Sequence, residues 1–286
     1  MKKDLQNKNS SSYRQIMKAT SIFGGVQVFN IIITILKSKV VAVLMGPAGI
    51  GVLGLFNSTI VLLSSLTNFG LDISSVKDIA AASQTKNNSK ISRIITIVKR
   101  LVWLTGIFGA LVTFFLSSWL SEIAFDTKEY TIAFMWLSGT ILLKQLSHGQ
   151  FAILQGLQKL KDLAMANLIG SALGLVASIP FYYYLELEGI VPGFIVTAIL
   201  TFVVAQYYGS RVKIDKITIT TKELKSEGKE MMILGFTLGL SGIMVLGESY
   251  AIRIFISNYG GVVEVGLYNA GIALVYTYVG LIFAAM

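Results

Sequence analysis

The sequence contains no cysteine, so disulfide bonds and thiol chemistry are excluded, and redox chemistry gives no indication of the compartment. Only 14% of the 286 residues are charged, whereas soluble domains carry about 25%. There is a single histidine, His148, and no cluster of metal-ligating residue types. These shortages argue against a soluble domain and against an enzyme, and we expect neither a cofactor nor a metal.

Long apolar stretches make up much of what remains. Hydrophobic residues account for 54% of the chain. Several uncharged stretches reach roughly 20 residues, the length that a helix needs to cross a hydrocarbon layer of ~30 Å. We therefore predict an all-α fold, a polytopic transmembrane helix bundle. Eight spans are predicted, at residues 16–45, 48–75, 101–120, 131–155, 163–185, 189–209, 231–257 and 265–286.

Lys and Arg residues gather in the loops on one side of these spans. They lie in the N-terminal tail and after spans two, four and six: Lys2, Lys3, Lys8, Arg14, Lys18, Lys77, Lys86, Lys90, Arg93, Lys99, Arg100, Lys159, Lys161, Arg211, Lys213, Lys216, Lys222, Lys225 and Lys229. Lys128 is the one basic residue in the opposite loops, which are otherwise acidic. Because basic loops are retained in the cytoplasm, the N-terminus is predicted to be cytoplasmic. We therefore attribute the net charge of +9 to residues that set the orientation of the chain in the membrane, and not to nucleic-acid binding. The polar segment 220–230 is suited to the membrane interface.

A glycine-rich stretch after the first span matches a nucleotide-binding fingerprint. Gly49, Gly51 and Gly54 fit G-x-G-x-x-G, and Asp72 lies about where that motif places its acid. However, the stretch joins two helical spans, and no βαβ unit surrounds it. Pro47 interrupts a helix and the glycines permit a tight reversal. We interpret the stretch as a turn between membrane spans, and the fingerprint as a false positive.

Four basic residues remain inside the spans, namely Lys37, Lys39, Lys144 and Arg253, together with the acids Asp72 and Glu248 and with His148. A charge at a helix centre costs about 2.5–3.5 kcal/mol on insertion, so such residues usually face a bundle interior or a wet cavity. Lys39 and Arg253 are near enough to a span end for the alternative, an interfacial position. Lys144 lies near the middle of span four. Lys37 and Lys39 are about 200° apart around a helix, so they cannot share one face.

Polar residues in spans two and four recur at helical spacing. The two series are Asn57, Ser64, Asn68, Asp72 and Ser75, and Thr140, Lys144, His148 and Gln155. The residues of such a stripe can simply form hydrogen bonds between packed helices, and this role suits the serines. A structural hydrogen bond is also the simpler role for His148. An aspartate and a lysine must be paired or hydrated, so the stripes favour a wet interior. The excess of cations inside the spans indicates an anionic substrate that carries phosphate or carboxylate groups.

The sequence resembles Wzx-type O-antigen flippases, which belong to the multidrug/oligosaccharidyl-lipid/polysaccharide exporter superfamily. The resemblance rests on the run from Lys39 through Gly46-Pro47-Ala48-Gly49-Ile50-Gly51, on Arg253, and on Glu264-Val265-Gly266-Leu267-Tyr268-Asn269-Ala270. It implies two six-helix lobes around a central cavity. Residues 1–210 would form the first lobe, 211–230 a cytoplasmic linker and 231–286 the start of the second lobe. Only eight of about twelve spans are present, so a truncated chain is expected.

The resemblance also implies a function. A flippase of this type moves an undecaprenyl diphosphate-linked O-antigen oligosaccharide, a lipopolysaccharide precursor, across the bacterial inner membrane by alternating access. On that basis we hypothesise that Lys39, Lys144 and Arg253 attract the diphosphate or acidic sugars. Asp72, His148 or Glu248 would take part in coupling to protons or sodium ions. The partners would be this lipid-linked sugar and the lipid bilayer.

Two alternatives remain open. A drug/ion antiporter of the same superfamily would be expected to place more acids than cations in its cavity. A membrane-embedded polysaccharide polymerase or glycosyltransferase would be expected to carry a large outer loop or a soluble catalytic domain with paired acids, and residues 1–286 contain neither.

Overall fold

A computed structural model describes residues 2–85, 87–215 and 217–285, with side chains described from Val28 onward except at 276–278 and 280–285. The basic side chains of the N-terminal tail, Lys86 and Lys216 lie outside this description. Within it the fold is all-α, as predicted. The helices are α1 (Lys2–Asn68), α2 (Leu71–Gln84), α3 (Asn88–Phe115), α4 (Ser117–Phe125), α5 (Thr131–Gly156), α6 (Leu160–Leu185), the 3₁₀ turn η1 (Glu186–Gly189), α7 (Ile190–Ser210), α8 (Thr221–Gly260) and α9 (Val262–Ala285).

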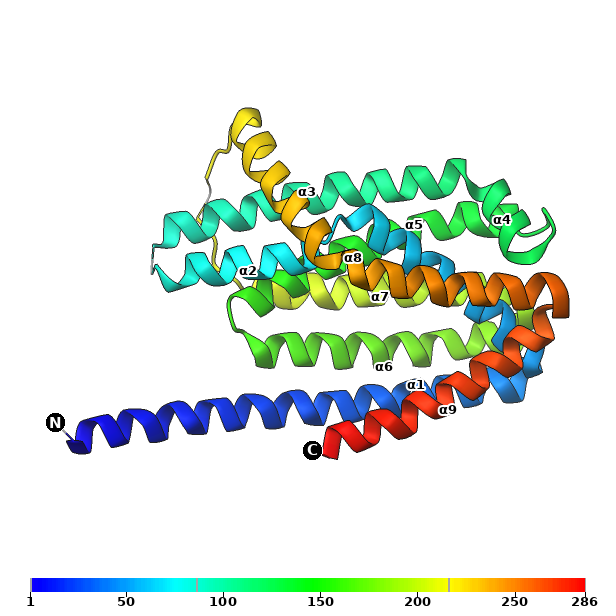
Figure 1. Cartoon of the computed structure of the whole chain (residues 1–286), viewed down its shortest axis with the longest axis horizontal. Helices are drawn as coiled ribbons and strands as arrows, with labels where there is room; N and C mark the ends of the chain where they lie inside the picture. Colours follow the sequence, from blue (N-terminus) through cyan, green and yellow to red (C-terminus); the bar gives the residue numbers. More distant parts are fainter. Residues whose placement is uncertain (1, 86, 216, 286) are drawn as a thin grey trace.

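Helix α1 contains the first predicted span and most of the second. At Gly46 the backbone leaves the helical region (φ 64°, ψ −165°), and Pro47 follows at once. A residue with a Cβ rarely adopts this positive φ, whereas glycine does so readily. Figure 1 shows α1 doubling back on itself as two rods. The predicted turn between two spans is therefore confirmed, and no nucleotide-binding strand–turn–helix unit surrounds the glycines in the described chain.

Four stretches of the described chain are long and apolar enough to cross a membrane: Val28–Asn68, Asn88–Phe115, Leu160–Ser210 and Thr221–Gly260. The first and third each contain two predicted spans. Helix α5, which carries predicted span four, is outside this set, and α9 contributes the shorter apolar helix Val262–Val275. All three tryptophans lie on the surface of the bundle, with exposed fractions of 50% for Trp103, 56% for Trp119 and 66% for Trp136. Such a surface suits lipid, because a soluble protein rarely exposes so much apolar area.

The second span differs from the prediction of one continuous helix over 48–75. Phe69 and Gly70 both have left-handed backbone angles (φ 51° and 64°), so α1 ends at Asn68 and α2 begins at Leu71. The following basic segment, 76–100, is also largely helical. It consists mainly of the end of α2 and the start of α3, because its charged side chains can point into water from a helix as well as from a loop.

Two apolar clusters hold the first seven helices together. One joins α2, α3, α5, α6 and α7 around residues such as Leu71, Ile95 and Ile153. The other lies near the Gly46 turn, where Phe56 of α1 packs on Phe125 (ring centroids 5.0 Å apart) and on Phe134 (5.1 Å). The two clusters fix α5 from both of its ends, and α5 carries most of the polar residues discussed below.

Helices α8 and α9 pack against α1 and α2 (Figure 1). The tightest crossing is between Gly70 and Gly235. A Cβ built on Gly70 would lie 2.0 Å from the Gly235 carbonyl oxygen, and a Cβ built on Gly235 would lie 2.5 Å from the Gly70 oxygen. The two backbones are therefore in direct contact, which only residues without side chains permit.

Candidate functional site

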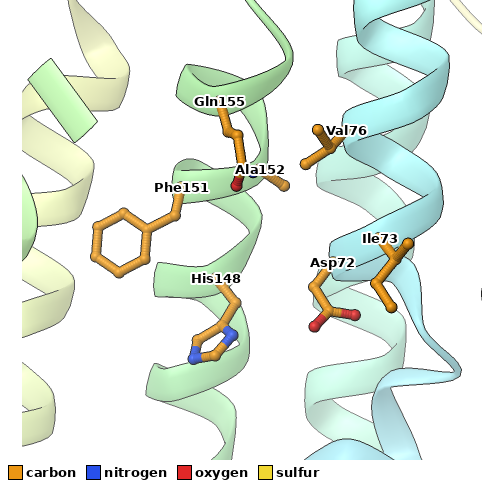
Figure 2. A pocket seen from close by; sticks show the side chains of 7 residues that line it. All are labelled: Asp72, Ile73, Val76, His148, Phe151, Ala152 and Gln155. Carbon is orange, nitrogen blue, oxygen red and sulfur yellow. The ribbon is translucent and has the colours of Figure 1, made fainter. Parts of the chain in front are cut away.

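A cavity of about 360 Å³ opens between α2 and α5. Figure 2 shows Asp72 of α2 and His148 of α5 at the same level of the cavity, on its two sides, with Gln155 further along α5. The remaining wall is apolar and consists of Ile73, Val76, Phe151 and Ala152. The cavity thus combines one acid, one imidazole and one amide with a largely apolar lining.

The break before α2 determines where Asp72 points. Because the helix restarts at Leu71, Asp72 stands in the first turn of a new helix. A carboxylate is stabilised there by the positive end of the helix dipole. The predicted polar stripe of span two is consequently divided. Asn68 is buried at the end of α1, whereas Asp72 is exposed to the cavity.

The stripe predicted for span four agrees better with the structure. Lys144 and His148 are one helical turn apart on α5, and both His148 and Gln155 reach the cavity. Their neighbour Gln145 points into the bundle instead. Its Nε2 donates to Asn68 Oδ1 (2.6 Å) and to Thr105 Oγ1 (3.0 Å), which links α1, α3 and α5 directly behind the cavity. Sequence reasoning missed Gln145, although its amide in an apolar span was a usable signal.

Lys37 and Lys39 lie on different faces of α1, as predicted, but Lys37 is the one that faces inward. Lys39 is exposed, whereas Lys37 is half-buried with its ammonium 5.5 Å from the centre of the Phe194 ring on α7. Lys144 of α5 is half-buried as well, and its charge interacts unfavourably with that of Lys37. The described residues show no ion pair for either lysine. The structure therefore pairs Lys144 with Lys37, a residue that the sequence-based site did not include.

Arg253 and Glu248 lie away from this cavity. The Arg253 Nε donates to Asn269 Oδ1 (2.8 Å) and its Nη1 donates to the Ser249 carbonyl oxygen (2.7 Å) and hydroxyl. Its guanidinium is also 5.7 Å from the centre of the Tyr268 ring. Arg253 thus ties α8 to α9. Glu248 is exposed on α8 and is not among the cavity-lining residues.

The glycine-rich stretch after the first span packs against α9. A Cβ built on Gly51 would lie 2.0 Å from the Val262 carbonyl oxygen, and one built on Gly54 would lie 2.0 Å from Asn269 Nδ2. Close helix packing therefore accounts for the spacing that imitates a nucleotide-binding fingerprint, since small residues let helices approach in a membrane.

Comparisons with known proteins agree with this architecture. The structure of the MATE multidrug transporter DinF-BH superposes with a TM-score of 0.71 at 12% identity, covering 92% of this chain and 61% of that one. An inward-facing multidrug resistance MATE family transporter of the MOP superfamily gives a TM-score of 0.56 at 15% identity, covering 88% of this chain and 56% of the other. No curated protein matches the sequence.

These likenesses show the fold, and this chain spans about three fifths of the length of the two solved transporters. The family follows from the sequence itself, because residues 16–286 match a family described as polysaccharide biosynthesis protein. This match covers nearly the whole chain, including both glycine motifs. The chain belongs to the polysaccharide biosynthesis protein family and has the helical fold of the MOP-superfamily transporters.

Proposed function

We propose that this chain acts in a flippase that moves an undecaprenyl diphosphate-linked oligosaccharide, of the O-antigen type, across the bacterial inner membrane. The observation that carries the proposal is the Lys37–Lys144 pair inside a bundle of a polysaccharide biosynthesis family. Two ammonium groups without an acidic partner among the described residues, held within a membrane span, are costly unless an anion or water compensates them. A diphosphate supplies that compensation through charge-assisted hydrogen bonds.

Within this proposal the basic residues have different tasks. Lys144, with Lys37 beside it, would hold the diphosphate, and the exposed Lys39 would attract it from the surface of α1. Arg253 would contribute to substrate binding indirectly, by holding α8 against α9, because its guanidinium is already hydrogen-bonded to Asn269 and Ser249. We propose that residues 1–210 move as one lobe, with 211–230 as linker and 231–286 as the start of the second lobe. Alternating access would then consist of motion between the lobes.

Ion coupling is proposed at Asp72 and His148, which line the same cavity from two helices (Figure 2). An imidazole and a carboxylate can each accept and release a proton, so proton coupling suits this pair. The described residues hold no group of three or more His, Asp or Glu placed to bind a metal ion. Glu248, the third candidate, is proposed to have a secondary role because it lies outside the cavity.

The location in the inner membrane and the cytoplasmic N-terminus are part of the same proposal. They are supported by the basic loops, which include the exposed Lys77, Lys90 and Lys161 on one side of the bundle. A reporter fusion at the N-terminus would test the orientation. A periplasmic N-terminus would contradict the proposed orientation.

Surface display of O-polysaccharide tests the function. A bacterium that lacks its own flippase would receive this chain alone, or this chain with the remaining helices of a full-length relative. Rescue in either arm supports the flippase, provided that the remaining helices alone do not rescue. Failure in both arms, with expression and the matching sugar pathway verified, contradicts the proposed substrate.

A drug antiporter is the second candidate, favoured by one observation. The cavity lining includes both the Asp72 carboxylate and the aromatic residue Phe151, and an acid with an aromatic ring can hold an aromatic cation. Efflux of a cationic dye from cells that express the chain separates the two functions. We expect no efflux, and efflux that is lost in Asp72→Asn would favour the antiporter.

A further inference from the structure

The start of α8 carries its acids and its lysines on different sides. Glu223 and Glu227 are four residues apart and both contact the Arg93 guanidinium of α3, Glu223 at 3.1 Å. Lys222, Lys225 and Lys229 follow steps of three and four residues, so they form one stripe, about 150° around the helix from the acids. All three lysines are exposed. Within the described chain they take part in no ion pair or hydrogen bond.

The acidic side of this segment is fixed to the bundle. Besides the Arg93 contacts, the Arg100 Nη1 donates to the Ile219 carbonyl oxygen (3.0 Å), and the Asp215 backbone N–H donates to the Ser92 hydroxyl (3.0 Å). Thr220 caps the helix: its backbone N–H and hydroxyl donate to the Glu223 carboxylate. These hydrogen bonds, with Arg93 opposite, hold the pKa of the Glu223 carboxyl below its usual value. The orientation of the lysine stripe is therefore set by contacts on the other side of the helix.

The lysine stripe lies just before the apolar part of its own helix. Figure 1 shows the first turns of α8 running across the other helices, while the rest of α8 runs along them. The apolar part of the helix begins at Met231, two residues after Lys229. By the helical rise, Lys222 is about 13 Å before that point along the helix. All three ammonium groups are thus within reach of a headgroup layer.

We propose that Lys222, Lys225 and Lys229 form a docking stripe for the anionic headgroups of phospholipids. Charge complementarity carries this proposal: Glu223 and Glu227, which would repel such headgroups, are turned toward Arg93, and the three lysines are exposed on the opposite side. The exposed Glu230 lies about 110° around the helix from the stripe. Each lysine near an anionic surface strengthens its attraction about fivefold. The stripe therefore anchors the segment between α7 and α8 to the membrane surface. This inference does not depend on which substrate the protein transports.

The absence of cysteine makes a direct test simple. Ser226 is exposed beside the stripe, so Ser226→Cys provides a single labelling point for an environment-sensitive dye. The labelled chain would be placed in nanodiscs of phosphatidylcholine, with increasing fractions of phosphatidylglycerol. We expect a spectral shift that grows with phosphatidylglycerol and is reduced by high salt. Replacing all three lysines by glutamine should weaken the attraction of this segment to the anionic surface roughly 100-fold, and the spectral shift should then be lost.

A matched variant removes three exposed lysines elsewhere on the same side of the bundle, Lys77, Lys90 and Lys161. It should retain the response. The proposal is overturned if the dye reports the same environment with and without phosphatidylglycerol, or if the two triple variants respond alike. A loss of signal in the stripe variant that also occurs in pure phosphatidylcholine would indicate a structural role and would likewise overturn it.

Discussion

Gly266 of α9 lies directly against the main chain of Pro47 in α1. A Cβ built on Gly266 would be 1.9 Å from the Pro47 carbonyl oxygen, a separation that no side chain can occupy. This contact joins the turn between the first two spans to the start of the last described helix. The two segments are more than 200 residues apart in the sequence.

We expect Gly266→Ala to destabilise the chain by about 1–3 kcal/mol, the usual effect of overpacking a close contact. Gly271→Ala on the same helix is the control, because a Cβ at Gly271 would meet nothing within 4 Å. Thermal unfolding in detergent, followed by loss of the helical circular dichroism signal, measures both variants. Equal unfolding temperatures for the two variants would contradict the packing assigned to Gly266.

Neutralising the paired lysines should impair transport of an anionic substrate. Lys144→Met and Lys37→Met are each expected to reduce O-polysaccharide display by at least about tenfold, since a charge-assisted hydrogen bond contributes roughly 1.5–3 kcal/mol. Lys128→Met, in an exposed loop, is the control. Transport that survives loss of both Lys37 and Lys144 would exclude this pair as the anion site.

Replacing Gln145 by leucine should lower stability without touching the cavity. The change removes two hydrogen bonds and leaves the buried Asn68 amide without the Gln145 partner, at a cost of about 1–3 kcal/mol. Gln155→Leu provides the comparison, because Gln155 is exposed to the cavity and its side chain has no hydrogen bond within the described residues. If both variants unfold at the same temperature as the wild type, the hydrogen bonds of Gln145 to Asn68 and Thr105 are not important for stability.

Asp72→Asn and His148→Gln should each abolish the stimulation of transport by a proton gradient. Because the two side chains line one cavity and would act on the same proton, the double variant should be no worse than either single variant. Transport into inverted vesicles, with and without an imposed pH gradient, measures the effect. Glu248→Gln is the comparison and should keep the stimulation. Additive losses, or equal losses in all three single variants, would contradict a paired role.

Much of the architecture could be predicted from charge and hydropathy. Apolar length indicated the helices, and Gly46 with Pro47 marked the first turn, because few residues tolerate that backbone. The second break had no such signal. Phe69 adopts a left-handed conformation that a large side chain rarely takes, and it does so where Gly70 meets Gly235 from another helix. A contact between segments so distant in sequence is not visible in the local pattern.

The choice between Lys37 and Lys39 shows the same limit. Helical spacing allowed at most one of them to face a cavity, but it could not decide which. That decision depends on Phe194, a ring on α7 that lies near Lys37 only after the bundle has assembled. By contrast, Lys144, His148 and Gln155 belong to one helix. Their common face was therefore predictable from α5 alone.

The interruption at Phe69 and Gly70 has a mechanical consequence. Asp72 stands two residues beyond the point where α8 contacts Gly70, in the first turn of α2, while Leu71 and Ile79 anchor α2 in the apolar cluster. The acid of the cavity is therefore held between a backbone crossing on one side and the bundle core on the other. We expect a displacement of α8 against Gly70 to press on the residues that position this carboxylate.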